Sequence, residues 1–114
     1  MSNVRQIQSH QFDQEVLRAS EPVLVDFFAT WCPPCRVIGP ILDRLSQEFA
    51  GQIKFLKINV DEAPDLAYRY GITGVPTLIL FLKGQIVDTL VGLLPPDALR
   101  QRLNSVLTPH RQDT

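Results

Sequence analysis

The chain has 114 residues, which suits one compact domain and leaves too little for a second. Hydrophobic residues make up 45% and charged residues 20%, and the net charge is −1 because 11 basic residues nearly match 12 acidic ones. This balance argues against a nucleic-acid-binding or membrane-binding surface, since both favour clustered positive charge. Residues 1–9 hold no apolar core of signal-peptide length, and the longest apolar stretch, Leu78–Leu82, is too short to cross a bilayer. We therefore expect a cytoplasmic protein. We also expect a monomer.

The N-terminal third of the chain predicts two strands with a short helix between them. Val4–Gln8 is a weak strand, and Phe12–Leu17 has a short helical pattern. Val23–Phe28 is β-branched and aromatic, and it is apolar on both faces except at Asp26. Such a run is typical of a central strand that is covered on both sides.

The middle of the chain predicts a long amphipathic helix followed by a strand. The helix is expected from Pro34 to Phe49, with a kink at Pro40, because proline removes an amide donor and crowds the preceding turn. Gly51 closes it. Ile53–Val60 reads as the next strand, on which Lys57 shares the face of Phe55.

The last third predicts a short helix, a hairpin and a final helix. The short helix spans Asp65–Tyr70, and the hairpin joins Thr77–Leu82 to Gln85–Val91 through Lys83-Gly84. The final helix starts at Pro95-Pro96-Asp97, and the polar tail 109–114 is expected to fray, leaving one domain over residues 1–108. Strand-like and helix-like stretches thus alternate, which predicts an α/β fold with a central mixed five-stranded sheet flanked by four helices.

Cys32 and Cys35 lie where the apolar strand gives way to the long helix. A helix N-terminus offers unpaired amide donors and a positive dipole end, which favour a thiolate over a thiol. Since the thiolate is the reactive form, we expect a lowered pKa at Cys32, the outer and exposed cysteine. Cys35, one turn along and facing inward, is placed to attack Cys32 after a mixed disulfide has formed there.

Four other interpretations of the cysteine pair are weaker. Zinc needs about four ligands, yet the chain has two cysteines and its histidines, His10 and His110, lie near opposite ends, so we expect no metal. Haem attachment needs a histidine where Arg36 stands. A purely structural disulfide at this spacing would constrain little chain, and two inert buried thiols fit poorly beside Trp31 and a double proline. A redox-active pair is the best interpretation.

A Cys-x-x-Cys motif is only moderately specific, but here it stands with a strand aspartate and a Val-Pro-Thr segment at fitting distances. The chain resembles the thioredoxin family over nearly its whole length, through the stretches Val23-Leu24-Val25-Asp26-Phe27, Ala29, Trp31-Cys32, Pro34-Cys35, Pro40-Ile41-Leu42, Asn59-Val60-Asp61, Tyr70-Gly71-Ile72, Gly74-Val75-Pro76-Thr77 and Val91-Gly92. The resemblance implies the thioredoxin fold and a thiol–disulfide oxidoreductase that reduces protein disulfides.

The resemblance also implies roles for individual residues. Cys32 would be the nucleophile and Cys35 the resolving thiol, in a cycle that opens and closes a Cys32–Cys35 disulfide. Asp26 would lie beneath the pair and transfer protons, and a carboxyl in an apolar strand is indeed expected to have a raised pKa. A purely structural aspartate is the alternative. Lys57 resembles the partner of this aspartate, although a solvated strand lysine is an equally good interpretation.

A docking surface around the cysteines is implied in the same way. Val75-Pro76 resembles the family's cis-proline loop, which would bring the backbone of Val75 against the cysteines to pair with a substrate strand. The surrounding apolar rim and substrate-binding positions would be Trp31, Pro33, Pro34, Gly74, Val75, Pro76, Gly92 and Leu93.

Three positions depart from the family pattern. Pro33 stands where most thioredoxins have glycine, Phe28 where many have a second tryptophan, and Pro95-Pro96 in a loop that is usually more polar. Residues between the cysteines tune the relative stability of dithiol and disulfide, so the reduction potential does not follow from the resemblance.

The oxidised pair must be reduced again by another protein, and the resemblance implies a flavin-dependent thioredoxin reductase that draws on NADPH. This chain has no Gly-x-Gly-x-x-Gly loop and is expected to bind neither cofactor itself. Its substrates would be diverse disulfide-containing proteins. Two alternatives are a dedicated electron donor to one peroxidase or reductase, and a binding module of the same fold that needs no redox turnover.

Overall fold

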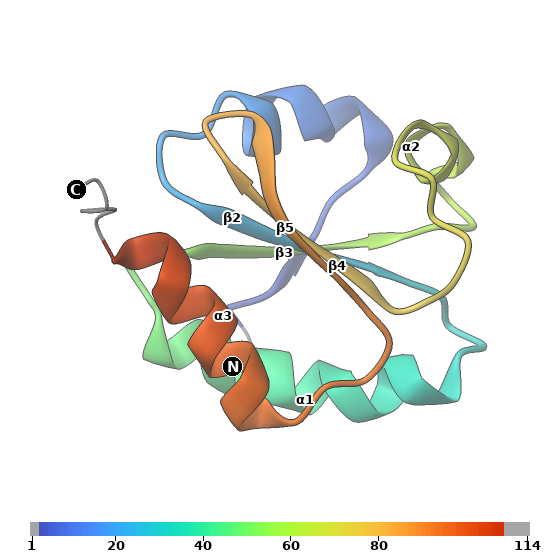
Figure 1. Cartoon of the computed structure of the whole chain (residues 1–114). Helices are drawn as coiled ribbons and strands as arrows, with labels where there is room; N and C mark the ends of the chain where they lie inside the picture. The colour runs from blue at the N-terminus through green and yellow to red at the C-terminus, as the bar shows by residue number, and fades with distance from the viewer. Residues whose placement is uncertain (1–2, 109–114) are drawn as a thin grey trace.

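A five-stranded sheet lies between two helical layers in the computed structural model, which describes residues 3–108 (Figure 1). The strand order is β1-β3-β2-β4-β5. β1 and β2 run parallel to β3, whereas β4 is antiparallel to both β2 and β5, so the predicted mixed sheet is confirmed. The strands are β1 (Arg5–Gln6), β2 (Val23–Phe28), β3 (Lys54–Asn59), β4 (Thr77–Leu82) and β5 (Gln85–Val91).

Helices cover both faces of this sheet. α1 (Pro33–Glu48) and α3 (Pro96–Leu107) lie on one face, while α2 (Pro64–Arg69) and the N-terminal helical segment lie on the other (Figure 1). That segment was predicted as one short helix, and it is a 3-10 turn at Ser9–Gln11 followed by a π-helical stretch at Asp13–Leu17. No helix within residues 3–108 is long and apolar enough to span a membrane.

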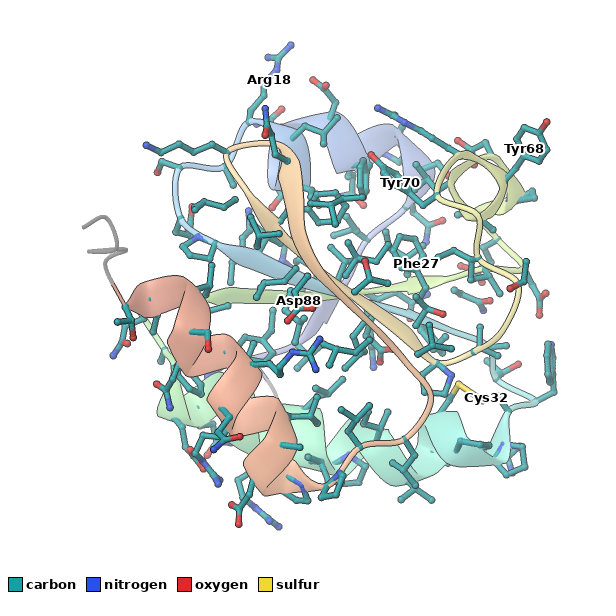
Figure 2. The ribbon with its side chains drawn as sticks, in the orientation of Figure 1. Arg18, Phe27, Cys32, Tyr68, Tyr70 and Asp88 are labelled. Carbon is teal, nitrogen blue, oxygen red and sulfur yellow. A yellow bond between two sulfur atoms is a disulfide. The ribbon has the colours of Figure 1, made fainter. Side chains whose placement is uncertain are left out.

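The alternation of side chains along β2 divides the core into two clusters. Leu24 faces α1 and α3, where it packs in one cluster with residues such as Ile38 and Leu103. Val25 and Phe27 face the opposite layer, and Figure 2 shows Phe27 and Tyr70 on that side of the sheet. Because Asp26 follows the direction of Leu24, its carboxyl group points beneath α1.

The start of α1 differs slightly from the prediction, and the difference matters for the site. The helix begins at Pro33, one residue earlier than expected, so that Cys32 is its N-cap. Proline suits this first turn because the amide that it lacks would have no partner inside the helix. α1 continues through Pro40, and the kink expected there stays a prediction. Gly51 follows the end of α1 and has a φ of 82°. The predicted tail, 109–114, lies outside the described residues.

The hairpin between β4 and β5 turns at Lys83 and Gly84, which have φ of 52° and 81°. Positive φ at both central residues is the pattern of a type I′ turn. This turn packs closely on the N-terminal helical segment, since a Cβ at Gly84 would lie 2.9 Å from the carbonyl oxygen of Leu17.

We predict that Gly84→Ala lowers the free energy of unfolding by about 2–3 kcal/mol, through left-handed backbone strain and the clash with Leu17. Gly71→Ala is the matched control, because Gly71 also has a positive φ of 63° but a Cβ there would meet nothing within 4 Å. It should lose only about 1 kcal/mol. Denaturant unfolding of both variants measures the difference, and equal losses would contradict the contact with Leu17.

Candidate active site

Cys32 and Cys35 form a disulfide at the N-terminus of α1 (Figure 2), with their Cα atoms 5.3 Å apart. The amide of Cys35 donates a hydrogen bond of 3.1 Å to the sulfur of Cys32, and the amide of Arg36 donates to the carbonyl of Cys32 at 3.3 Å. The sulfur of Cys32 is therefore itself the capping group of the helix. An N–H donor and the positive end of the helix dipole both favour negative charge on that sulfur.

Both cysteines are buried in this oxidised form, and the prediction of an exposed Cys32 is wrong. Cys32 is 2% exposed and Cys35 is 7% exposed. The sulfur of Cys32 turns toward the helix N-terminus and lies 3.5 Å from the carbonyl oxygen of Val75. Ala29 packs in the same small cluster, with Phe28 against it, so neighbouring chain covers the sulfur.

Asp26 is 5% exposed, and one of its carboxylate oxygens, Oδ1, has no hydrogen-bond partner within residues 3–108. Burial removes the carboxylate from water and raises the pKa of Asp26 to about 7, while the positive charge of Lys57 acts in the opposite direction. Lys57 lies directly beside Asp26, because the two residues are paired in the parallel register of β2 and β3. Asp26 can thus exchange a proton near neutral pH.

A cavity of about 250 Å³ connects this carboxyl group with Cys35. It is large enough to admit water, and it has polar groups on its wall. The cavity brings together three predicted site residues, Asp26 of β2, Cys35 of α1 and Lys57 of β3. Its lining is formed by Asp26, Phe28, Ala29, Thr30, Cys35, Arg36, Gly39 and Lys57.

The loop before β4 lies against the disulfide from the other side. The Val75-Pro76 peptide bond is cis, as the family resemblance implied. Two hydrogen bonds hold the loop: the amide of Gly92 donates to the carbonyl of Pro76 at 2.8 Å, and the hydroxyl of Thr77 donates to the carbonyl of Gly74 at 2.6 Å. Val75 is thereby kept beside Cys32 with its carbonyl toward the sulfur.

The predicted rim is divided between two grooves. Trp31 is 63% exposed, and its indole N–H donates to Asp61 at 2.9 Å. It borders one groove of about 280 Å³, whereas Leu93 borders another together with Val37 and Ile41. Pro33 and Pro34 are exposed at the start of α1.

The sequence did not identify five of the eight residues that line the first groove. The residues that it did not identify come from the end of β3, from α2 and from the loop after α2: Val60, Pro64, Ala67, Ile72 and Thr73. A usable signal was present, because parallel strands β2 and β3 end at the same edge of the sheet, so the residues that follow each strand meet there.

Within residues 3–108 no three His, Cys, Asp or Glu side chains lie close enough together to hold a metal ion. The reactive groups that the site presents are the two sulfur atoms, with the titratable carboxyl group of Asp26 behind them. A dithiol pair that opens and closes in this setting exchanges with other disulfides, which defines a thiol–disulfide oxidoreductase.

Comparison with known proteins identifies the family. The thioredoxin family model matches residues 3–105. The chain is 47% identical over 107 residues to thioredoxin 1 of Nostoc sp. and 46% identical over 107 residues to thioredoxin 1 of Synechococcus elongatus, in each case over 94% of this chain and 100% of the relative. It is 44% identical over 104 residues to the chloroplastic thioredoxin M4 of Arabidopsis thaliana, covering 91% of this chain and 54% of that protein.

The chain belongs to the thioredoxin family. It is accordingly a thiol–disulfide oxidoreductase of the protein-disulfide reductase type, as the sequence predicted.

The raised pKa of Asp26 predicts how stability depends on pH. Between the ordinary value, 3.8, and about 7, the folded protein keeps a proton that the unfolded chain has lost, so the free energy of unfolding falls as pH rises through this window. From pH 5 to pH 8 we expect the oxidised protein to lose about 3 kcal/mol, and Asp26→Asn to lose almost none. Denaturant unfolding at several pH values measures both slopes, and parallel slopes would contradict a protonated Asp26.

Proposed function

We propose that this protein reduces disulfides of diverse protein substrates, with Cys32 as the nucleophile. The Cys32 thiolate attacks one sulfur of a substrate disulfide, the other substrate sulfur leaves as a thiolate, and a mixed disulfide forms. Cys35 then loses its proton and attacks the sulfur of Cys32. This second exchange releases the remaining substrate thiolate and closes the Cys32–Cys35 disulfide, so two electrons have passed to the substrate.

The position of Cys32 as the N-cap of α1 is the observation that carries this proposal. Its sulfur accepts a hydrogen bond from the amide of Cys35. That hydrogen bond and the positive end of the helix dipole both stabilise negative charge on the sulfur. Burial alone would favour the neutral thiol, so the nucleophile is assigned from these donors and not from exposure. Cys35 lies in the first turn of α1, close enough to Cys32 for the resolving attack.

Asp26 is the proposed proton acceptor for Cys35. Both residues line the same cavity, and a pKa of about 7 leaves the carboxyl group able to take up a proton at neutral pH and release it again. Lys57 stabilises the carboxylate form of Asp26, because its positive charge lowers the pKa that burial raises. The carboxyl group thus assists the resolving step from behind the disulfide.

Substrates are proposed to dock on the surface that surrounds Cys32. The backbone of Val75 is available to an extended substrate strand, and Trp31 and Gly74 border the adjoining groove. Backbone pairing reads no side-chain identity, which suits many unrelated substrates. The remaining proposed contacts are Pro33, Pro34, Pro76, Gly92 and Leu93.

Turnover requires that another protein reduce the Cys32–Cys35 disulfide again. We assign this step to a thioredoxin reductase that takes electrons from NADPH through a flavin, with neither cofactor bound by this chain. A reducing cytoplasm is the proposed compartment, because a dithiol that must be regenerated would not be maintained in an oxidising one. The working form is proposed to be the monomer.

Trapping with Cys35→Ser tests the nucleophile and the partners together. This variant should accumulate mixed disulfides through Cys32, because nothing remains to resolve them, whereas the matched variant Cys32→Ser should accumulate almost none. Non-reducing electrophoresis and mass spectrometry of the adducts from cell extract provide the measurement. Many adducts are expected. A single dominant adduct would indicate a dedicated electron donor, and absence of adducts would overturn the assignment of Cys32.

Removal of the carboxyl group should slow only the resolving step. We predict that Asp26→Asn releases substrate from the mixed disulfide about 10–100-fold more slowly at pH 7. The difference should shrink toward pH 9, because more of the Cys35 thiol ionises unaided at higher pH. Single-turnover kinetics with a fluorescent disulfide peptide separate attack from resolution. An equal slowing at both pH values would contradict proton transfer by Asp26.

A further inference from the structure

The ammonium group of Lys57 lies over an aromatic ring. Its Nζ atom is 5.7 Å from the centroid of the Phe28 ring, a distance at which the face of the ring attracts a cation. Lys57 pairs with Asp26 across β2 and β3, and Phe28 comes two residues after Asp26 on the same face of the sheet. The ring, the ammonium group and the carboxyl group therefore meet at one cavity, whose wall Cys35 completes.

Within residues 3–108, no hydrogen bond or ion pair holds the side chain of Lys57. Lys54, on the same strand, shows the contrast: its ammonium group forms an ion pair of 2.8 Å with Glu15 and donates to the carbonyl of Glu15 at 2.8 Å. A lysine side chain without such a partner is free to extend into water, where solvent screens its charge. The contact with the Phe28 ring is therefore an interaction that can position the Lys57 charge.

We propose that Phe28 is a positioning residue, whose ring holds the Lys57 ammonium group at the cavity and thereby sets how tightly Asp26 binds its proton. The inference rests on the proposed function for its consequence in the resolving step. The electrostatic linkage between Phe28, Lys57 and Asp26 does not depend on the proposed function, because it is a property of the resting, oxidised protein.

Within the described range, 3–108, few charges other than Lys57 face Asp26. From α1, Cys35 is held in the disulfide, and Arg36 directs its guanidinium group to the carbonyl of Thr30 at 2.9 Å. From β4, the residue opposite Asp26 is the apolar Leu78. Lys57 of β3 is thus the charged neighbour of Asp26, and its contact with the Phe28 ring can control the distance between the two charged groups.

Loss of the ring should therefore act on Asp26 only through Lys57. When the ammonium group moves into solvent, the carboxylate loses a stabilising charge and Asp26 keeps its proton to higher pH. At neutral pH a smaller fraction of Asp26 is then ready to accept a proton from Cys35.

A double-mutant cycle on the oxidised protein tests the linkage, since its cysteines do not titrate. The titration of the Asp26 carboxyl carbon is followed by NMR in the starting protein, Phe28→Leu, Lys57→Met and the double variant. We expect Phe28→Leu to raise the measured pKa of Asp26 by about 0.5 and to add nothing in the Lys57→Met background. An equal rise in both backgrounds would show that the ring acts by packing, and no rise would show no linkage; either result overturns the proposal.

A second readout does not depend on whether Phe28→Leu folds. Protons above a ring face are shifted upfield, so the ε-methylene protons of Lys57 should be shifted upfield in the unmodified protein and in Phe28→Trp, whose larger ring attracts cations best. Random-coil shifts in either protein would overturn the proposal. Neither measurement involves turnover. If both show no linkage through Phe28, the role of Asp26 in proton transfer is still tested separately by the rate of mixed-disulfide resolution.

Discussion

The burial of β2 on both faces is the constraint on which the rest of the structure depends. The strand lies between β3 and β4, with α1 and α3 against one face and the opposite helical layer against the other. Since its side chains alternate, any polar residue in it is enclosed by one layer or the other. Asp26 is that residue, and it is enclosed beneath α1. The end of the same strand delivers the chain to Cys32 and to the first turn of α1.

The site places two groups in opposite electrostatic surroundings. At Cys32 the helix N-terminus provides a donor and a favourable dipole for a thiolate. At Asp26 the carboxyl group is buried and its Oδ1 has no hydrogen-bond donor within residues 3–108, so the charged form is disfavoured. A buried carboxyl group whose Oδ1 has no hydrogen-bond partner within residues 3–108 lowers the free energy of unfolding above neutral pH. This loss matters because a domain of this size is only marginally stable. The gain is a group that exchanges protons at the pH where disulfide exchange occurs.

Local patterns were sufficient for most of the fold. The five strands, the helical stretches and the hairpin all follow from periodicity and from the glycine and proline positions. The boundaries differ by one or two residues, except that the N-terminal helical segment begins at Ser9 and not at Phe12. The N-terminal segment was helical as predicted but not α-helical, because backbone periodicity over so few residues does not distinguish the helix types. The exposure of Cys32 was predicted wrongly, since it depends on Val75, which is distant in the sequence, and on the direction in which the sulfur turns. Val60, Ala67 and Ile72 were missed for a similar reason.

The sequence by itself determined the chemistry of the protein: a Cys-x-x-Cys pair at a strand-to-helix junction, an aspartate in an apolar strand, and the family to which both belong. These features are local, because they depend on residue type and on spacing of a few positions. Only the tertiary structure decided that Lys57 lies beside Asp26, that Phe28 lies under the Lys57 ammonium group, and that a cavity joins them to Cys35. Strand register and side-chain packing set those relations, and both arise from contacts between segments far apart in the chain.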